Sequence, residues 1–100
     1  MDRKIALITG SAKGLGKMTA LTLASQGCDI ALNYMNSHEE AVHLQSRIEN
    51  MGVRCIAVQA DISIEEDIDQ LVDEVEQQLG GIDILVNNAG PFYPGTPFIR

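Results

Sequence analysis

The sequence predicts an α/β fold, the first half of a doubly wound parallel sheet, and two observations support this prediction. Short and almost fully apolar runs alternate with longer segments in which apolar residues recur at helical spacing. The connections between these segments are short. Apolar strands that alternate with amphipathic helices indicate a parallel sheet with helices on both faces. With right-handed crossovers, the order β-α-β-α-β-α-β gives a strand order of 3-2-1-4.

Four segments have the apolar pattern of buried strands, and the three segments between them have helical spacing. The expected strands cover residues 5–8, 29–34, 53–60 and 82–86, and the expected helices cover 15–26, 37–51 and 63–79. The glycines at 27, 52 and 80 suit the left-handed position just past a helix end. The first helix is predicted to bury a stripe made of Leu15, Met18, Leu21, Leu23 and Ala24.

Two of the expected helices begin with a serine that stands three residues before a glutamate. The pairs are Ser37 with Glu40 and Ser63 with Glu66. This spacing predicts a capping box, in which the hydroxyl and the carboxylate each accept a hydrogen bond from a free backbone N–H group.

Composition limits the classes of function. The chain has 100 residues, of which 45% are hydrophobic and 21% charged, as in an ordinary soluble domain, and its net charge is −7. There is no cluster of Lys and Arg for nucleic acid, and no apolar run approaches the roughly 20 residues of a membrane span. We therefore expect a single cytoplasmic domain over residues 1–100 that binds neither nucleic acid nor a membrane. Cys28 and Cys55 match no metal or redox motif and are expected to be buried free thiols; no metal site is expected.

A glycine-rich turn follows the first expected strand. Residues 9–16 read T-G-S-A-K-G-L-G. Glycines let the backbone approach a pyrophosphate closely, and the helix N-terminus offers free N–H groups and a positive dipole end. Gly16 lacks a side chain where helix and strand must pack closely. This context predicts nucleotide binding, the alternative being a glycine loop that serves only helix packing.

The end of the second expected strand indicates which nucleotide. An NAD site usually has Asp or Glu there, on the ribose hydroxyls, but this chain reads Asn33-Tyr34-Met35-Asn36, and its nearest acids, Glu39 and Glu40, belong to the next helix. The missing acid removes a repulsion toward a 2′-phosphate, and Lys13 can supply a positive charge. The sequence therefore favours NADP over NAD.

Three motifs together resemble those of the short-chain dehydrogenase/reductase family. They are the T-G-x-x-x-G-x-G turn, the acidic-aliphatic pair Asp61-Ile62, and N-N-A-G at residues 87–90. The resemblance covers the chain through Gly90 and implies a Rossmann-type fold. Within the family the chain looks most like 3-oxoacyl-(acyl-carrier-protein) reductases. This resemblance implies an NADP-dependent oxidoreductase that acts on a carbonyl or acyl-carrier-bound substrate and forms homo-oligomers.

The resemblance also implies roles for individual residues. Asp61 would accept a hydrogen bond from the adenine amino group, with Ile62 against the ring, whereas Thr9 and Asn87 would tie the first and fourth strands together. The pyrophosphate and adenosine ribose would lie on the backbone of Gly10, Ser11, Ala12, Lys13, Gly14, Leu15 and Gly16. The 2′-phosphate would be surrounded by Lys13, Asn33 and Tyr34, and the part of the cofactor toward the nicotinamide by Asn88, Ala89 and Gly90. His38 and His43 are expected to be solvated, without a role.

The family's catalytic residues have no counterpart here. The family uses a tyrosine and a lysine four residues apart, after the N-N-A-G strand, with a serine upstream and an asparagine on the fourth helix. The two tyrosines, Tyr34 and Tyr93, have His38 and Pro97 at the fourth position. We therefore expect the cofactor-binding half of a reductase, truncated before its catalytic segment and inactive by itself. The alternatives are a non-catalytic dinucleotide-binding module and an inert fragment.

Overall fold

The computed structural model describes residues 3–88 and has the predicted order of strands and helices. All three strand pairs are parallel, and the sheet order is β3-β2-β1-β4, which confirms the prediction. The strands are β1 (Ile5–Ile8), β2 (Asp29–Tyr34), β3 (Cys55–Gln59) and β4 (Ile84–Val86). The helices are α1 (Gly14–Ser25), α2 (His38–Glu49) and α3 (Glu65–Gln78).

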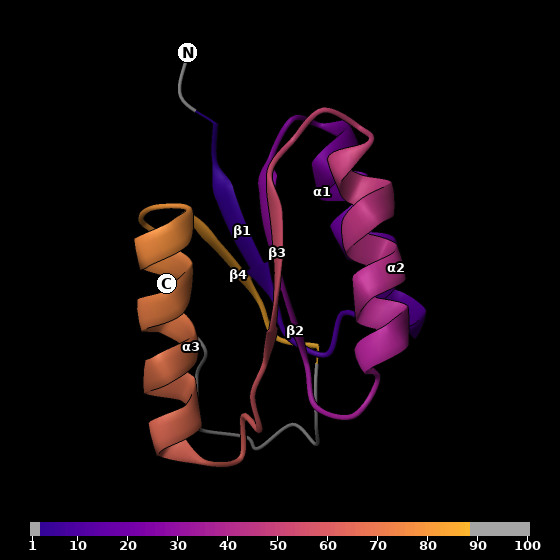
Figure 1. Ribbon diagram of the computed structural model, residues 1–100. Helices are drawn as coiled ribbons and strands as arrows, with labels where there is room; N and C mark the ends of the chain where they lie inside the picture. The colour runs from indigo at the N-terminus through magenta and orange to yellow at the C-terminus, as the bar shows by residue number, and fades with distance from the viewer. Residues whose placement is uncertain (1–2, 89–100) are drawn as a thin grey trace.

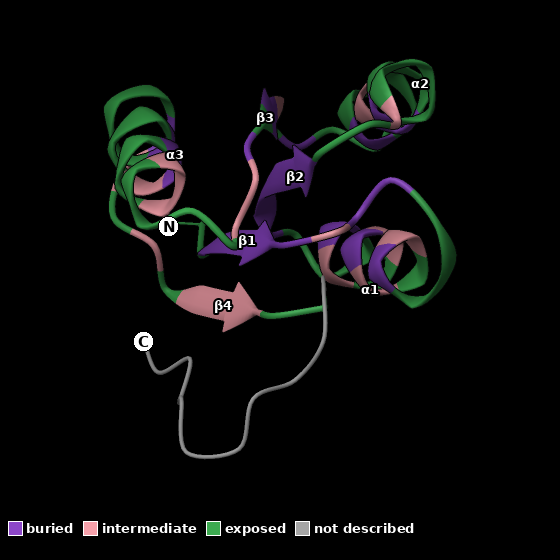
Figure 2. Cartoon of the chain, turned by 90° about the horizontal axis from the view of Figure 1, so that it is seen from below, coloured by how far each residue is buried: buried purple, intermediate pink, exposed green. Residues whose placement is uncertain are grey.

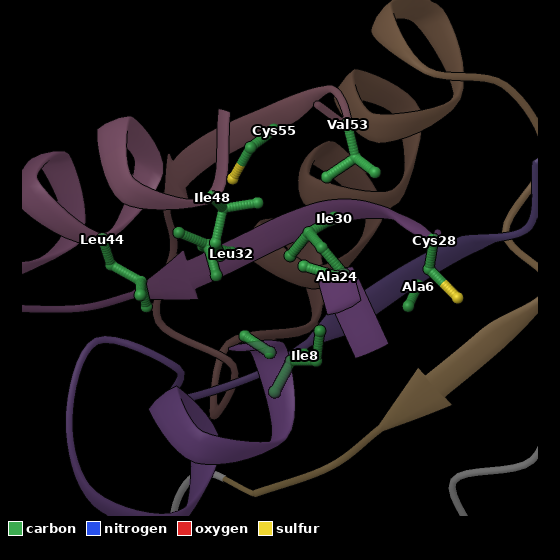
Figure 3. Close-up of a cluster of buried hydrophobic side chains, with 11 residues drawn as sticks. Ala6, Ile8, Ala24, Cys28, Ile30, Leu32, Leu44, Ile48, Val53 and Cys55 are labelled. Carbon is green, nitrogen blue, oxygen red and sulfur yellow. The ribbon is translucent and has the colours of Figure 1, made fainter. Parts of the chain in front are cut away.

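The molecule has three layers, with α1 and α2 on one face of the sheet and α3 on the other (Figure 1). Alternate side chains of a strand point to opposite faces, so β1 contributes to both cores. Ala6 and Ile8 lie in the core under α1 and α2, and Ile5 and Leu7 lie in the core under α3. Figure 3 shows the first of these cores, in which Ile30 and Leu32 of β2 lie with residues of both helices.

The buried stripe predicted for α1 is wrong. Leu15 and Met18 are 73% and 65% exposed, and the buried residues of α1 are Gly16, Ala20 and Ala24. Of the predicted stripe, Leu21 and Leu23 are partly buried against the core, and only Ala24 is fully buried. The helix lies close to the loop before it, and residues with little or no side chain make that approach possible. The spacing of apolar residues in the other two helices also predicts buried stripes, and these are confirmed only in part. Most of their members are buried or half-buried, among them Leu44, Ile48, Leu71 and Val75, whereas Met51 and Ile64 at the ends of the predicted stripes are exposed.

Both predicted capping boxes are also wrong. Ser37 is the N-cap of α2, but its side chain makes no capping hydrogen bond. The N-cap of α3 is Ile64, and the hydroxyl of Ser63 donates to Oδ1 of Asp61 instead, at 2.6 Å. At this helix start Asp67 reaches back and accepts a hydrogen bond from the Asp61 backbone N–H at 2.9 Å.

The expectations for the glycines and the cysteines agree with the structure. Gly27, Gly52 and Gly80 have positive φ angles after the three helices. Cys28 and Cys55 are free and buried, and burial, with a smaller contribution from Glu49, raises the pKa of the Cys55 thiol to about 12. Within residues 3–88, no helix combines the length and apolar character that crossing a membrane requires.

Candidate functional site

The candidate site lies at the carboxyl edge of the sheet, where the four parallel strands end together. The glycine-rich turn follows β1, Asp61 follows β3, and Asn87 and Asn88 follow β4. From β1 the chain adds β2 and β3 on one side of the sheet, and it then returns to add β4 on the other side of β1. The strand order therefore changes direction at β1. In open α/β sheets, ligands bind at this kind of switch point, outside the carboxyl ends of the strands.

The N-terminus of α1 opens directly onto this edge. Gly10 and Gly14 have φ angles of 60° and 59°, which the turn needs in order to reverse and enter the helix. The N-cap residue, Lys13, makes no side-chain capping bond, and the first turn contains no acidic residue. The first backbone N–H groups of a helix have no intrahelical partner, and they carry its positive dipole end. This helix start is therefore suited to an anion.

Gly16 holds α1 against the glycine-rich turn. A Cβ atom at this position would lie 2.4 Å from the Gly10 carbonyl oxygen, 2.9 Å from Cα of Ser11 and 2.8 Å from Nδ2 of Asn88. Two of these neighbours are backbone atoms that cannot move aside easily. The close packing expected at Gly16 is thus present, and its partner is the turn itself together with Asn88.

Ser11 and Ala12 are buried and attach the turn to β2. The Ser11 backbone N–H donates to the Asn33 carbonyl oxygen at 3.0 Å, and the Ser11 hydroxyl accepts from the Asn33 N–H at 3.1 Å. Ala12 packs against Tyr34 and Ala41. Because these contacts extend the β1–β2 pairing into the turn, the turn is held in one position.

Asn33 and Tyr34 lie beside the turn, but their side chains are buried. Oδ1 of Asn33 accepts from the Gly10 N–H at 3.3 Å, and its Nδ2 donates to the Ala60 carbonyl oxygen at 3.1 Å. The Tyr34 hydroxyl is 2.6 Å from Nδ1 of His38, whose ring is exposed like that of His43. Asn33 thus connects the turn to the end of β3 beneath the surface.

Lys13 reaches toward the N-terminus of α2. Its Nζ lies 3.8 Å from Oε2 of Glu40, and the two side chains are 67% and 52% exposed. The sequence assigned Glu40 to a helix interior away from the site. Only the packing of α1 beside α2 brings this carboxylate to Lys13, and no local sequence signal marks it.

Asp61 stands at the end of β3 with one carboxylate oxygen engaged. Its Oδ1 accepts from the Ser63 hydroxyl at 2.6 Å and from the Ser63 N–H at 2.9 Å. These two hydrogen bonds, the hydroxyl's first, lower the pKa of Asp61. Ile62 is half-buried against the core under α3.

Thr9 joins the ends of β1 and β4. Its hydroxyl donates to Oδ1 of Asn87 at 2.9 Å and accepts from the Asn88 N–H at 2.9 Å. This confirms the tie predicted for Thr9 and Asn87, and it brings Asn88 to the N-terminus of α1. Ala89, Gly90 and Tyr93 lie outside the described residues.

The arrangement at this edge is chemically suited to an anionic ligand, because it places free backbone N–H groups and the positive end of the α1 dipole at the surface. Of the sequence-predicted site residues, the structure brings Gly10, Ser11, Gly16, Asn33 and Asn88 into direct contact, and Asp61 lies along the same edge. Over residues 3–88, no group of three His, Cys, Asp or Glu side chains is arranged to hold a metal ion.

Among curated proteins, the chain is 42% identical over 91 residues to general stress protein 39 of Bacillus subtilis, covering 91% of this chain and 32% of that protein. It is 39% identical over 87 residues to the 3-oxoacyl-(acyl-carrier-protein) reductase FabG of Staphylococcus epidermidis, covering 87% of this chain and 36% of that enzyme. The chain thus spans about a third of the length of these relatives.

Solved structures of dehydrogenases and reductases are also similar to this chain. A dehydrogenase/reductase from Sinorhizobium meliloti matches with a TM-score of 0.84 and 44% identity, over 87% of this chain and 34% of that one. An NADH-dependent reductase in complex with NAD matches with a TM-score of 0.81 and 34% identity, over 89% of this chain and 37% of that one. The family model for short chain dehydrogenases matches residues 4–99. The chain therefore belongs to the short chain dehydrogenase family.

Proposed function

We propose that this chain is the cofactor-binding part of an NADP(H)-dependent oxidoreductase that transfers hydride between nicotinamide and a carbonyl or alcohol substrate. The observation that carries the proposal is the uncapped N-terminus of α1, held under the glycine-rich turn at the carboxyl edge of the sheet. Membership of the family supports the oxidoreductase activity. The similarity to an NADH-dependent reductase in complex with NAD supports a nicotinamide dinucleotide as the cofactor, and it does not favour NADP.

The residues at this edge fit a dinucleotide. A side chain at position 16 would fill the space between helix and turn, and no acidic residue in the first turn of α1 opposes an anion. In our proposal the backbone from Gly10 to Gly16 binds the pyrophosphate through N–H groups and the helix dipole. The bound nicotinamide would supply or accept the hydride.

The adenosine end is proposed to lie across β2 and β3. Within the part of the chain that the structure describes, Oδ2 of Asp61 accepts no hydrogen bond, and we propose that it accepts from the adenine amino group while Oδ1 stays on Ser63. Asn88, Ala89 and Gly90 are proposed to follow the cofactor toward the nicotinamide. For Asn33 we favour an indirect role, because contact with the cofactor would require its buried hydrogen bonds to Gly10 and Ala60 to break.

The preference for NADP over NAD is proposed to depend on Lys13. Its ammonium group is exposed at the N-terminus of α1, and no acid stands at the end of β2 to accept ribose hydroxyls. Tyr34 supports the turn by packing on Ala12. The substrate is proposed to resemble that of the 3-oxoacyl-(acyl-carrier-protein) reductases among the relatives, in a cytoplasmic homo-oligomer.

Calorimetric titration with NADPH and NADH tests this proposal. The titration uses the full protein, by which we mean the whole oxidoreductase of which we propose this chain to be a part. We expect NADPH to bind more tightly. Lys13→Glu should weaken NADPH by up to about 2–3 kcal/mol, the upper range for a hydrogen bond to a charged group, and should change NADH much less. Equal affinities for the two nucleotides would refute the role of Lys13, and the absence of binding by either would refute the cofactor site.

A further inference from the structure

The ion pair between Lys13 and Glu40 connects the N-termini of two helices. Lys13 is the N-cap residue of α1, and Glu40 lies in the first turn of α2, on the same face of the sheet (Figure 2). Their charged atoms are 3.8 Å apart, and both side chains remain more than half exposed. The pair is therefore held loosely enough to open, and it lies where a ligand at the carboxyl edge would meet it.

The helix dipoles act on these two charges in opposite ways. A lysine at a helix N-terminus faces the positive end of the dipole, which is unfavourable, whereas a glutamate in the first turn is favourable. Glu40 is anchored by the dipole of α2 and neutralises Lys13. The groups that share an open hollow with Glu40 are Asn36, His38, Glu39 and His43.

We propose that Glu40 is a specificity-determining residue that limits the preference for NADP by competing for the Lys13 ammonium. This inference rests on the proposed function, in which Lys13 binds the 2′-phosphate. A 2′-phosphate must take Lys13 from Glu40, and it then has the carboxylate as a neighbouring negative charge. NADH carries no 2′-phosphate and avoids both costs. Glu40 thus weakens NADPH selectively, although it lies outside the strand end where an acid normally governs this choice.

The effect should be moderate because the pair is exposed. Ion pairs between exposed side chains contribute about 0.2–1 kcal/mol, which corresponds to at most about a fivefold change in affinity. Removing the carboxylate should therefore raise the NADPH affinity about two- to fivefold and leave the NADH affinity nearly unchanged. Because the interaction is between exposed charges, the gain should shrink as salt is raised.

The experiment measures dissociation constants for NADPH and NADH by calorimetry on the full protein and on four variants. Glu40→Gln removes the carboxylate at nearly constant shape. Glu39→Gln is the matched control, because it removes the same charge from the same helix turn, while within the described residues the ion pair of Lys13 is with Glu40. Lys13→Gln alone and Lys13→Gln combined with Glu40→Gln together test whether Glu40 acts through Lys13.

We expect Glu40→Gln to raise the ratio of NADPH to NADH affinity at least twofold, Glu39→Gln to leave it nearly unchanged, and Glu40→Gln to have little effect once Lys13 is replaced. An unchanged ratio in Glu40→Gln, or an equal rise in Glu39→Gln, overturns the role of Glu40 and leaves the cofactor site standing. Failure of the unmodified protein to bind either nucleotide overturns the proposed function, and this inference with it.

Discussion

At the scale of single residues, Gly16 is the position where the site and the packing depend on the same atoms. The Cβ of an alanine would lie 2.4 Å from the Gly10 carbonyl oxygen and 2.9 Å from Cα of Ser11. Either α1 or the turn must shift, and overpacking of this kind costs about 1–3 kcal/mol. We expect Gly16→Ala to lower the thermal unfolding midpoint of the full protein and to weaken binding of NADPH and NADH alike.

Gly81→Ala is the matched control for this prediction. Gly81 has no atom near enough to touch an added Cβ, and its φ angle is not in the left-handed region. We expect its free energy of unfolding to stay within about 0.5 kcal/mol of the unmodified protein, as for most surface substitutions. If Gly16→Ala were equally harmless, the close approach of α1 to the turn would not exist in solution.

The close packing at Gly16 could be predicted from the sequence, because it follows from a local pattern. The pattern is a glycine near the start of the helix in a βαβ unit, where no side chain fits. The same reasoning could not find the pairing of Lys13 with Glu40, since the two residues stand 27 positions apart and meet only through the packing of α1 and α2. The family resemblance implied a ligand role for Asn33, and the structure shows its side chain in buried hydrogen bonds to Gly10 and Ala60. Whether such a side chain faces the ligand or the protein depends on neighbours that the sequence does not identify.

At the scale of elements, a buried carboxylate holds the amino edge of the sheet, opposite the candidate site. Asp29, the first residue of β2, accepts from the Arg54 backbone N–H at 2.9 Å and from the Arg54 guanidinium at 2.8 and 2.9 Å. Arg54 also donates to the Leu79 carbonyl oxygen after α3, and Arg3 donates to Asp29 at 3.4 Å. One carboxylate thus joins β2, the start of β3 and the end of α3.

We expect this cluster to make the protein sensitive to acid. Burial by itself would raise the pKa of Asp29, but the hydrogen bonds from Arg54 outweigh it and hold that pKa below its usual range. A carboxyl group with a lowered pKa in the folded state stabilises that state above its unfolded pKa of about 3.9. This contribution is lost as the pH falls through the folded pKa. Asp29→Asn should cost about 1–3 kcal/mol near pH 7 and less near pH 3.

Urea unfolding of the full protein between pH 7 and pH 3 measures this difference. Asp73→Asn, on the exposed side of α3, removes a carboxylate that has no buried partner among residues 3–88, and it should shift the whole curve only slightly. A loss in Asp29→Asn that is the same at both ends of the pH range would mean that the ionised carboxylate of Asp29 does not contribute to stability.

The helix pattern shows which features of an element can be predicted from its own sequence. The stripes of α2 and α3 could be predicted, because large apolar side chains face the sheet at regular spacing. In α1 the large side chains of Leu15 and Met18 are exposed, and small residues face the sheet. Tertiary contact at the turn decides that orientation. The capping boxes failed for a related reason, since Ser63 forms a local turn with Asp61 in place of a cap.

At the scale of the whole molecule, the order of the sheet followed from alternation and handedness, while the central strands are more deeply buried than the edge strand β4. Every residue of β1 and β2 is buried, but Ile84, Leu85 and Val86 of β4 are only half-buried. Figure 2 shows β4 at the margin of the sheet, and within residues 3–88 it pairs with β1 alone. An apolar strand with one unpaired edge is a template for association with another chain.

We therefore expect the 100-residue chain, produced by itself, to be marginally stable or to self-associate. Sedimentation velocity over a range of concentrations should show an average sedimentation coefficient that rises with concentration, and thermal unfolding should be broad. The exposed Leu15 and Met18 of α1 offer a second apolar surface, so the double variant Leu15→Gln, Met18→Gln serves as a control. If the edge of β4 is responsible, this variant associates as the unmodified chain does. A monomer that unfolds in one sharp transition would contradict the prediction, because it would mean that β1, β2 and β3 stabilise the sheet sufficiently without a second neighbour for β4.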